Sequence, residues 1–301
     1  MPLLREETGA KGVPAASTAI MARVGTLYLV STPIGNLGDI SLRALDTLRS
    51  ASLIVAEDTR HTRKLLTHYD IHGPLLSYNE HSPPARLGQI LEALREGDVA
   101  AVTDAGTPGV SDPGRELVLA AYEEGLPVSA VPGPSAVLSA LILSGLPTES
   151  FLFLGFLPRR PRERQEKLRQ VRDLGYTLVL FEAPHRLLRT LEALEDELGD
   201  RPIAVTRELT KLHEEIRRST ISAERAYWTA NQPRGEYTLV IGQGAPQEPE
   251  EAATSPLDEV ERLVEGGMHA SAAVRQVAHE TGTSRKQLYQ EWLEKHHDSP
   301  P

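Results

Sequence analysis

The stretch from Val99 to Gly114 constrains the fold of this chain more than any other. It begins as an apolar run of strand length, reaches an acid at Asp104, and continues as a loop rich in glycine and proline. A segment with the hydrophobic spacing of a helix follows. This order is typical of an open α/β sheet, in which ligands bind at the carboxyl ends of the strands. We predict a ligand-binding loop here; the alternative is an ordinary strand-to-helix turn.

Length and composition limit the classes of protein that need to be considered. The 301 residues contain no cysteine, which excludes disulfides, thiolate metal sites and a cysteine nucleophile. A net charge of −10 argues against bulk, non-specific binding of nucleic acid. No apolar run approaches the roughly 18 residues that a membrane span requires. Residues 1–23 lack the apolar segment of a signal peptide. We therefore expect a disordered extension there and a cytoplasmic protein without a membrane partner.

The hydrophobic pattern predicts the α/β class, with strands that alternate with helices into a mostly parallel sheet. Later strands include the charged, β-branched run 216–221, which favours antiparallel pairing and a mixed second sheet. The expected strands lie near 25–30, 53–56, 75–78, 99–102, 128–131, 151–155, 177–181, 203–206, 215–221 and 237–242.

Composition also suggests where the domains begin and end. The Pro-Gly-Pro-Ser run at 132–135 separates an N-terminal α/β domain at 24–132 from a C-terminal α/β domain at 133–242. Residues 243–256 are rich in Pro and Glu, which is typical of a linker. Residues 257–298 then show the outline of a small helix-turn-helix unit.

Four motifs fall at the ends of expected strands, where the loops of an α/β active site gather. They are Ser31–Asp39, Glu57–Lys64, Thr103–Gly114 and Phe181–Arg186. For the second and fourth motifs, an ordinary charged helix start is an equally good interpretation. The glycine fingerprints of dinucleotide-binding folds and P-loops are absent. No metal site is expected, because the His68/His72 pair is followed at once by Gly-Pro and has no third ligand nearby.

The segment 159–172 reverses the sign of the charge locally. It holds seven cations against two glutamates on an otherwise acidic chain. A solvated helix face would explain this pattern, and so would a contact for phosphates. No aromatic residue lies among these cations, so base stacking is not indicated there.

Together the motifs resemble a known family. They are Ser-Thr-Pro-Ile-Gly-Asn-Leu-Gly-Asp at 31–39, Glu-Asp-Thr-Arg at 57–60, Asp-Ala-Gly-Thr-Pro at 104–108, Ser-Asp-Pro-Gly at 111–114, Val-Pro-Gly-Pro-Ser at 131–135 and Glu-Ala-Pro-His-Arg at 182–186. In this order they resemble the ribosomal RNA small subunit methyltransferase I family of the tetrapyrrole-methylase superfamily, over roughly residues 24–298.

The resemblance implies a two-domain tetrapyrrole-methylase fold that holds S-adenosylmethionine in the cleft between its domains. It implies 2′-O-methylation of a cytidine ribose in the decoding region of 16S rRNA in the small ribosomal subunit, and a homodimer. By position, it implies cofactor contacts from Pro33, Asp104, Gly106, Thr107, Pro108, Ser135, Ala136, Phe181, Leu209, Tyr237 and Thr238.

The implied reaction needs a group that accepts the proton of the 2′-hydroxyl, and a general base contributes about 10²–10⁴-fold. Acids and histidines at strand ends are the candidates: Asp58, Glu80, His81, Glu182 and His185. We favour the Glu182–Arg186 loop for the proton. Arg60 and Arg186 are predicted to anchor phosphate, because arginine binds phosphate through two parallel hydrogen bonds.

Two other functions fit parts of the sequence. A precorrin-type methylase acting on a small tetrapyrrole would need neither the cationic segment nor the C-terminal helices. A ligand-sensing regulator with a DNA-binding helix-turn-helix would need a basic C-terminal unit. Here Arg275, Arg285, Lys286 and Lys295 are offset by Glu280, Glu291, Glu294 and Asp298. Methylation of 30S subunits, without affinity for duplex DNA, separates these three functions.

Overall fold

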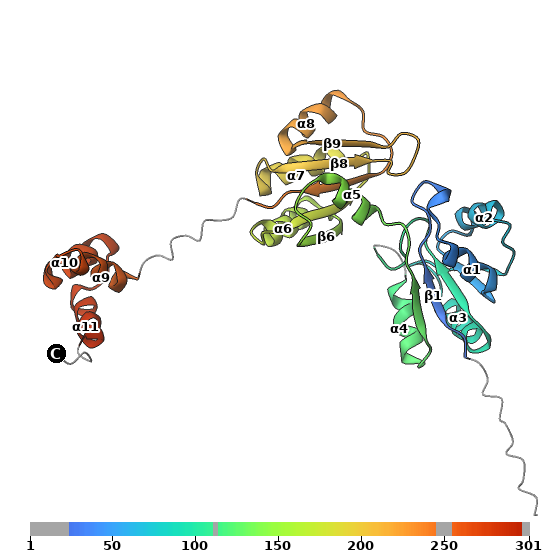
Figure 1. Cartoon of the computed structure of the whole chain (residues 1–301), viewed down its shortest axis with the longest axis horizontal. Helices are drawn as coiled ribbons and strands as arrows, with labels where there is room; N and C mark the ends of the chain where they lie inside the picture. Colours follow the sequence, from blue (N-terminus) through green and yellow to red (C-terminus); the bar gives the residue numbers. More distant parts are fainter. Residues whose placement is uncertain (1–23, 111–113, 245–254, 297–301) are drawn as a thin grey trace, which may run out of the picture. The chain divides into compact units, whose positions relative to one another are not determined.

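The computed structural model describes residues 24–110, 114–244 and 255–296 (Figure 1). The expectations for the extension at 1–23, for positions 111–113 of the central loop and for most of the 243–256 linker lie outside these residues. Within them, two five-stranded sheets carry helices on their faces, so the predicted α/β class is confirmed.

The first sheet is entirely parallel and has the strand order β3-β2-β4-β1-β5. Its strands are β1 (Leu27–Val30), β2 (Leu53–Ala56), β3 (Leu75–Ser77), β4 (Val99–Val102) and β5 (Val128–Val131). The helices between them are the 3-10 helix η1 (Leu37–Asp39), α1 (Leu42–Ser50), α2 (Thr59–His68), α3 (Pro84–Glu96) and α4 (Arg115–Glu123).

Both faces of this sheet are buried, which explains why its strands read as continuous apolar runs. On β2, Ile54 and Ala56 face the core shared with α1 and α2, whereas Val55 faces the core shared with α3 and α4. All four residues of β4 are buried. Helices therefore occupy both faces, and the carboxyl edge is left for loops.

The second sheet is mixed, as the charged strand predicted, and has the order β6-β7-β10-β8-β9. Of the strand pairs described in this second sheet, β6–β7 is parallel and the other three are antiparallel. Its strands are β6 (Phe151–Phe156), β7 (Thr177–Glu182), β8 (Pro202–Arg207), β9 (Glu215–Thr220) and β10 (Tyr237–Ile241). The associated helices are α5 (Ala136–Ser144), α6 (Pro161–Arg172), α7 (Leu187–Leu198) and α8 (Ile221–Ala230).

Helix α5 shows how the sequence sets one of these boundaries. Ser135 ends the Pro-Gly-Pro-Ser run and accepts a hydrogen bond from the Leu138 backbone N–H, which satisfies a free donor of the first helical turn. Val137, Ala140 and Leu141 pack in one core with Val179, Ala204 and Val240 of the second sheet. The start of α5 is thereby fixed against that sheet.

The C-terminal helices form a separate three-helix unit with its own core. They are α9 (Pro256–Glu265), α10 (Ala270–Thr281) and α11 (Arg285–His296). The core of this unit includes Val260, Val274, Val277 and Leu288. In the part of the chain that the structure describes, no helix is both long and apolar enough to cross a membrane.

A buried carboxylate in α8 braces the start of β10. The fully buried Glu224 accepts hydrogen bonds from the Trp228 indole N–H (2.9 Å), the Ser219 hydroxyl (2.7 Å) and Arg217 Nε (3.1 Å). The Trp228 ring in turn packs edge-on against Tyr237, with 5.3 Å between the ring centroids. Glu224 therefore positions, through Trp228, the first residue of β10.

Removing this carboxylate should destabilise the protein strongly, because it leaves buried donors and a cation without their partner. For Glu224→Ala we expect the free energy of unfolding in urea to fall by about 3–5 kcal/mol. Glu124→Ala is the control, because it removes only the exposed Arg95–Glu124 pair and should cost under about 1 kcal/mol. Equal losses in the two variants would contradict this interpretation of Glu224.

Candidate active site

Two loops at the carboxyl edge of the first sheet are joined through their backbones. Thr32 and Gly106 form an isolated antiparallel bridge, with N–H···O distances of 2.9 and 3.1 Å. Gly106 adopts a φ of +80°, a conformation that glycine reaches without the strain of a side chain. The Thr32 hydroxyl also donates to the Thr103 carbonyl at 3.2 Å. The loop after β1 is thus held against the loop after β4.

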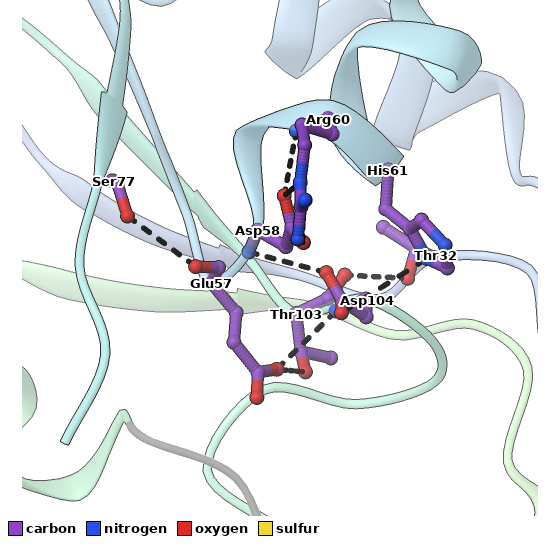
Figure 2. A network of polar contacts seen from close by, with 8 residues as sticks. All are labelled: Thr32, Glu57, Asp58, Arg60, His61, Ser77, Thr103 and Asp104. Carbon is purple, nitrogen blue, oxygen red and sulfur yellow. Dashed lines mark hydrogen bonds and ion pairs between the residues drawn. The ribbon is translucent and has the colours of Figure 1, made fainter. Parts of the chain in front are cut away.

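A network of acids connects the neighbouring ends of β2 and β4 (Figure 2). The Thr103 hydroxyl donates to Glu57 Oε2 at 2.7 Å, and the Asp58 backbone N–H donates to Asp104 Oδ1 at 3.2 Å. Arg60 binds Asp58 through both Nε and Nη2, with a shortest distance of 2.6 Å. Three carboxylates therefore gather at one edge, and internal donors hold each of them.

The surroundings move the pKa values of two of these acids in opposite directions. Hydrogen bonds from Arg60 hold the pKa of Asp58 far below its usual range. Burial, together with the negative charge of Glu57, raises the pKa of Asp104 above its ordinary value. Asp58 is therefore a poor proton acceptor. Asp104 instead takes up a proton at a higher pH than an ordinary aspartate does.

The second sheet contributes an aromatic and polar wall. In the antiparallel register of β7 and β10, Phe181 pairs with Thr238 and Glu182 pairs with Tyr237. The Phe156 ring lies 5.6 Å from that of Phe181, centroid to centroid. The register explains why residues more than fifty positions apart in the sequence line the same wall.

A strained loop after β8 meets the loop after β1. Glu208 and Thr210, which flank the buried Leu209, have φ values of +50° and +65°, uncommon for residues with side chains. The Asn36 backbone N–H donates to the Thr210 hydroxyl at 3.0 Å. At Gly35 a Cβ atom would stand 2.4 Å from Lys211 Cγ and 2.9 Å from the Leu209 carbonyl oxygen. Only glycine lets the two loops come this close.

These loops enclose a cavity of about 360 Å³, the cofactor cleft, a size within the usual range of small-molecule sites. Nine of the eleven predicted cofactor residues line it: Asp104, Gly106, Thr107, Ser135, Ala136, Phe181, Leu209, Tyr237 and Thr238. Pro33 and Pro108 are not among the lining residues, and Pro108 is buried. Each of these prolines lies one position from a residue that does line the cleft.

A second, polar hollow of about 600 Å³ shares Glu57 and Asp104 with the cofactor cleft. We name it the acceptor hollow; it is lined by Glu57, Asp58, Thr59, Arg60, Ser77, Asn79, Glu80, His81 and Asp104. Four of the residues predicted for the reaction line it: Asp58, Arg60, Glu80 and His81. The two shared carboxylates form the boundary between an apolar cleft and a hydrophilic one.

The predicted loop Glu182–Arg186 lies partly inside the cofactor cleft and is bonded internally. The buried Glu182 carboxylate accepts from the Ala183 N–H at 2.8 Å and from the Thr190 hydroxyl, and it pairs with Arg186 Nε at 3.2 Å. Arg186 also donates to the Leu157 carbonyl at 2.6 Å. Its guanidinium is therefore committed to the protein, which leaves it little capacity to anchor phosphate. His185 is exposed and lines neither cavity.

Sequence reasoning missed part of the cleft. Ile34, Glu57, Phe156 and Glu236 line it but were not assigned to the cofactor. Glu57 belongs to a recognised motif and directly follows β2, the neighbour of β4. Its place in the lining of the cleft could therefore have been predicted. Phe156 follows a register shift between Phe153 and Phe156 in the β6–β7 pair, which no sequence periodicity indicates.

Among the described residues no cluster of three His, Asp or Glu side chains is arranged to hold a metal ion.

Comparison with known proteins places this geometry in a family. The family model "Tetrapyrrole (Corrin/Porphyrin) Methylases" matches residues 26–223. A relative from Synechocystis sp., named ribosomal RNA small subunit methyltransferase I, is 48% identical over 274 residues, covering 90% of this chain and 98% of the relative. A relative of the same name from Bacillus subtilis is 42% identical over 272 residues, covering 88% and 93%. The chain belongs to the tetrapyrrole methylase family.

Solved structures agree with this assignment at the level of the fold. A cobalt precorrin-4 methyltransferase superposes with a TM-score of 0.57 at 20% identity, over 72% of this chain and 94% of its own. A uroporphyrin-III-C-methyltransferase from Thermus thermophilus has a TM-score of 0.50 at 25% identity, over 72% and 94%. The two-sheet architecture of this tetrapyrrole methylase is therefore shared with these two methyltransferases.

Tetrapyrrole methylases take their methyl group from S-adenosylmethionine, and the cofactor cleft fits this molecule chemically. Gly106, held at a positive φ, lines the cavity with no side chain between its backbone and a ligand. Phe156 and Phe181 offer aromatic surface, and Asp104 offers a partly exposed carboxylate to a cationic ligand. The cleft thus combines apolar and aromatic walls with polar side chains that can orient a ligand, as ligand sites commonly do.

Asp104 should determine how cofactor affinity depends on pH. Asp104→Ala removes a charged hydrogen-bond partner, a loss of about 1.5–3 kcal/mol that corresponds to roughly ten- to hundredfold weaker binding. Only the ionised carboxylate attracts a cation. The affinity for S-adenosylmethionine should therefore be highest above the raised pKa of Asp104 and should fall as the pH drops through that pKa. Calorimetric titrations at several pH values measure both effects.

Two variants serve as controls for this titration. Asp104→Asn keeps the shape of the side chain and should lose the pH dependence. Asp46→Ala removes an exposed acid of α1 paired with Arg49 and should change nothing. Wild-type affinity in a folded Asp104→Ala protein would remove Asp104 from the cofactor site.

Proposed function

We propose that the chain transfers the methyl group of S-adenosylmethionine to the 2′-hydroxyl of a cytidine ribose in the decoding region of 16S rRNA. The observation that carries this proposal is the acceptor hollow, which meets the cofactor cleft at Glu57 and Asp104. A hydrophilic hollow beside the methyl-donor site suits a ribose. The relatives named ribosomal RNA small subunit methyltransferase I, at 42–48% identity, support the same substrate.

S-adenosylmethionine supplies an activated methyl group on a sulfonium sulfur. The protein's contribution is then mainly to bind and orient, which can lower a barrier of this kind substantially. Ser135 at the start of α5, the pair Phe181–Thr238 and Leu209 would hold the cofactor from the second sheet. Asp104, Gly106 and Thr107 would hold it from the first.

The 2′-hydroxyl must lose its proton during or after the transfer. We retain the Glu182–Arg186 loop as the proposed proton acceptor. Within this loop Glu182 and Arg186 bind each other, which leaves His185 as the proposed acceptor. His185 is exposed and lines neither cavity, so this role requires the bound RNA to bring the 2′-hydroxyl within hydrogen-bond distance of it. Arg186 then acts as a positioning residue that keeps the buried Glu182 compensated. Arg60 lines the acceptor hollow with an exposed side chain, and it remains the proposed phosphate contact through Nη1, the nitrogen that Asp58 does not bind.

Substitution of His185 tests this assignment. His185→Ala is expected to slow single-turnover methylation of 30S subunits by about 10²–10⁴-fold at saturating cofactor, with unchanged cofactor affinity. Arg186→Ala should also lose turnover, because Glu182 loses its cation. His81→Ala, in the acceptor hollow, is the comparison variant. If His185→Ala and Arg186→Ala keep the wild-type rate and His81→Ala does not, the proton acceptor lies in the acceptor hollow.

Two parts of the chain outside the cleft are proposed to contact the rRNA. Helix α6 presents Arg162 and Lys167 to solvent, while Arg160 pairs with Glu163 and Arg169 pairs with Glu197. Even with these two ion pairs, the segment 159–172 therefore exposes cations to a ligand. The second part is the α9–α11 unit, which has its own core.

Truncation separates binding of the cofactor from recognition of the RNA. A protein ending at Gly242 keeps every residue that lines the cofactor cleft, so its calorimetric affinity for S-adenosylmethionine should equal that of the full chain. Its rate on 30S subunits should fall, because the α9–α11 unit is missing. A truncated protein that methylates 30S subunits at the full rate would show that these helices do not contact the substrate.

A precorrin-type methylase is the second candidate, since the fold is shared with a cobalt precorrin-4 methyltransferase. A small tetrapyrrole gives no reason for the cationic face of α6 or for the separate helical unit. We therefore favour the ribosomal substrate. The same assay on 30S subunits distinguishes these functions.

We further propose a homodimer that works in the cytoplasm, where its substrate is assembled. Support for the dimer comes from α5, which is apolar around its circumference. One side packs on the second sheet, while Leu138 and Ile142, one turn apart, are 53% and 71% exposed. Helices of this composition are ordinarily covered on all sides. A second copy of the chain would cover the outer side.

A further inference from the structure

Helix α2 carries a cationic ridge that borders the acceptor hollow. Its buried side consists of Thr62, Leu65 and Leu66. The opposite side lines a third hollow of about 560 Å³, formed by Arg60, Arg63, Lys64, Thr67 and His68. These positions recur every three or four residues, so they share one face of the helix. We name Arg63, Lys64, Thr67 and His68 the α2 ridge.

The three hollows adjoin through shared residues. The cofactor cleft and the acceptor hollow share Glu57 and Asp104, and the acceptor hollow and the third hollow, which the α2 ridge lines, share Arg60. A path therefore runs from the methyl-donor site across the acceptor hollow to the cations of α2. An RNA strand could follow this path, because a hydroxyl-bearing ribose suits the polar hollow and the phosphate next to it suits the cations.

The charge of Arg63 and Lys64 is available to a ligand. Both side chains are exposed, and within the described residues neither forms an ion pair. By contrast, Asp58 binds Arg60 through two of its nitrogens, and the exposed Arg49 of α1 and Arg95 of α3 are each paired with an acid. On a chain with a net charge of −10, two uncompensated cations on one helical turn create a local site for anions.

The acids of the acceptor hollow decide which part of a nucleotide goes where. Glu57, Asp58, Glu80 and Asp104 line that hollow and repel phosphate, but they accept hydrogen bonds from hydroxyl groups. The α2 ridge attracts phosphate instead. An RNA strand is therefore oriented with a ribose in the acceptor hollow and a neighbouring phosphate on α2.

We propose that the α2 ridge binds the phosphate backbone of the substrate RNA, with Arg63 and Lys64 as its contacts, and so positions the target ribose. This inference rests on the proposed function. It adds a binding surface in the first α/β domain to the contacts proposed for α6 and for the C-terminal helices. Its role is to position the strand, since neither cation lines the cofactor cleft.

The test compares the full-length wild type with Arg63→Gln/Lys64→Gln. On 30S subunits we expect KM to rise about tenfold and kcat to stay within about twofold, because the lost contacts lie outside the reacting centre. Affinity for S-adenosylmethionine should be unchanged. In equilibrium binding to a single-stranded RNA at several KCl concentrations, the slope of log K against log salt should become shallower by about 1.4, or 0.7 for each lost contact.

Two further variants make the result specific. Arg86→Gln/Arg189→Gln removes the same charge from α3 and α7, outside all three hollows, and should leave KM and the salt slope unchanged. Arg63→Lys/Lys64→Arg keeps the charge and should restore both values.

An unchanged KM and salt slope in Arg63→Gln/Lys64→Gln, or an equal loss in the control pair, would overturn the proposal. If the wild type methylates no 30S subunit, the proposed function fails. The salt dependence of RNA binding still tests the ridge in that case.

Discussion

The site depends on two backbone contacts that only glycine permits. The first is the bridge between Thr32 and Gly106, which joins the loops after β1 and β4. The second is the approach of Gly35 to the strained turn around Leu209, where a Cβ would meet both a side chain and a carbonyl oxygen. The first contact joins two loops at the carboxyl edge of the parallel sheet, and these loops line one side of the cofactor cleft. The second contact brings the loop after β1 against the strained loop after β8, which belongs to the second sheet.

The same contacts explain the distribution of strain and charge. Glu208 and Thr210 keep positive φ values because the loop is bonded on several sides: Glu208 accepts from the Glu236 N–H at 3.0 Å, and Thr210 donates its N–H to Glu214 at 2.7 Å. Strain of this kind persists only where the surroundings fix the conformation. The acids at the ends of β2 and β4 are fixed in a similar way by hydroxyl and backbone donors.

Much of this could be predicted from the sequence, because the strands of the first sheet are buried on both faces and end in recognisable loops. The strands at 53–56, 99–102 and 128–131 have the predicted bounds. The motifs also located Asp104, Gly106 and Thr107 in the cleft. The prediction was weaker where partners distant in sequence decide the outcome. Arg186 follows a conspicuous Glu-Ala-Pro-His motif, yet its guanidinium is bonded to Glu182 and Leu157.

The acidity of the whole chain and the cations of its surface have one consequence together. A net charge of −10 repels a polyanion. Attraction to RNA must therefore come from cations that lie within a Debye length of a phosphate, where salt does not screen the interaction. Cations already paired with acids, such as Arg169 with Glu197, contribute little to it. Under the proposed function, the uncompensated side chains of α2 and α6 would therefore carry the binding, and the repulsion elsewhere would oppose non-specific adsorption. Such an enzyme would select RNA that meets its few cations and its acidic hollow at the same time.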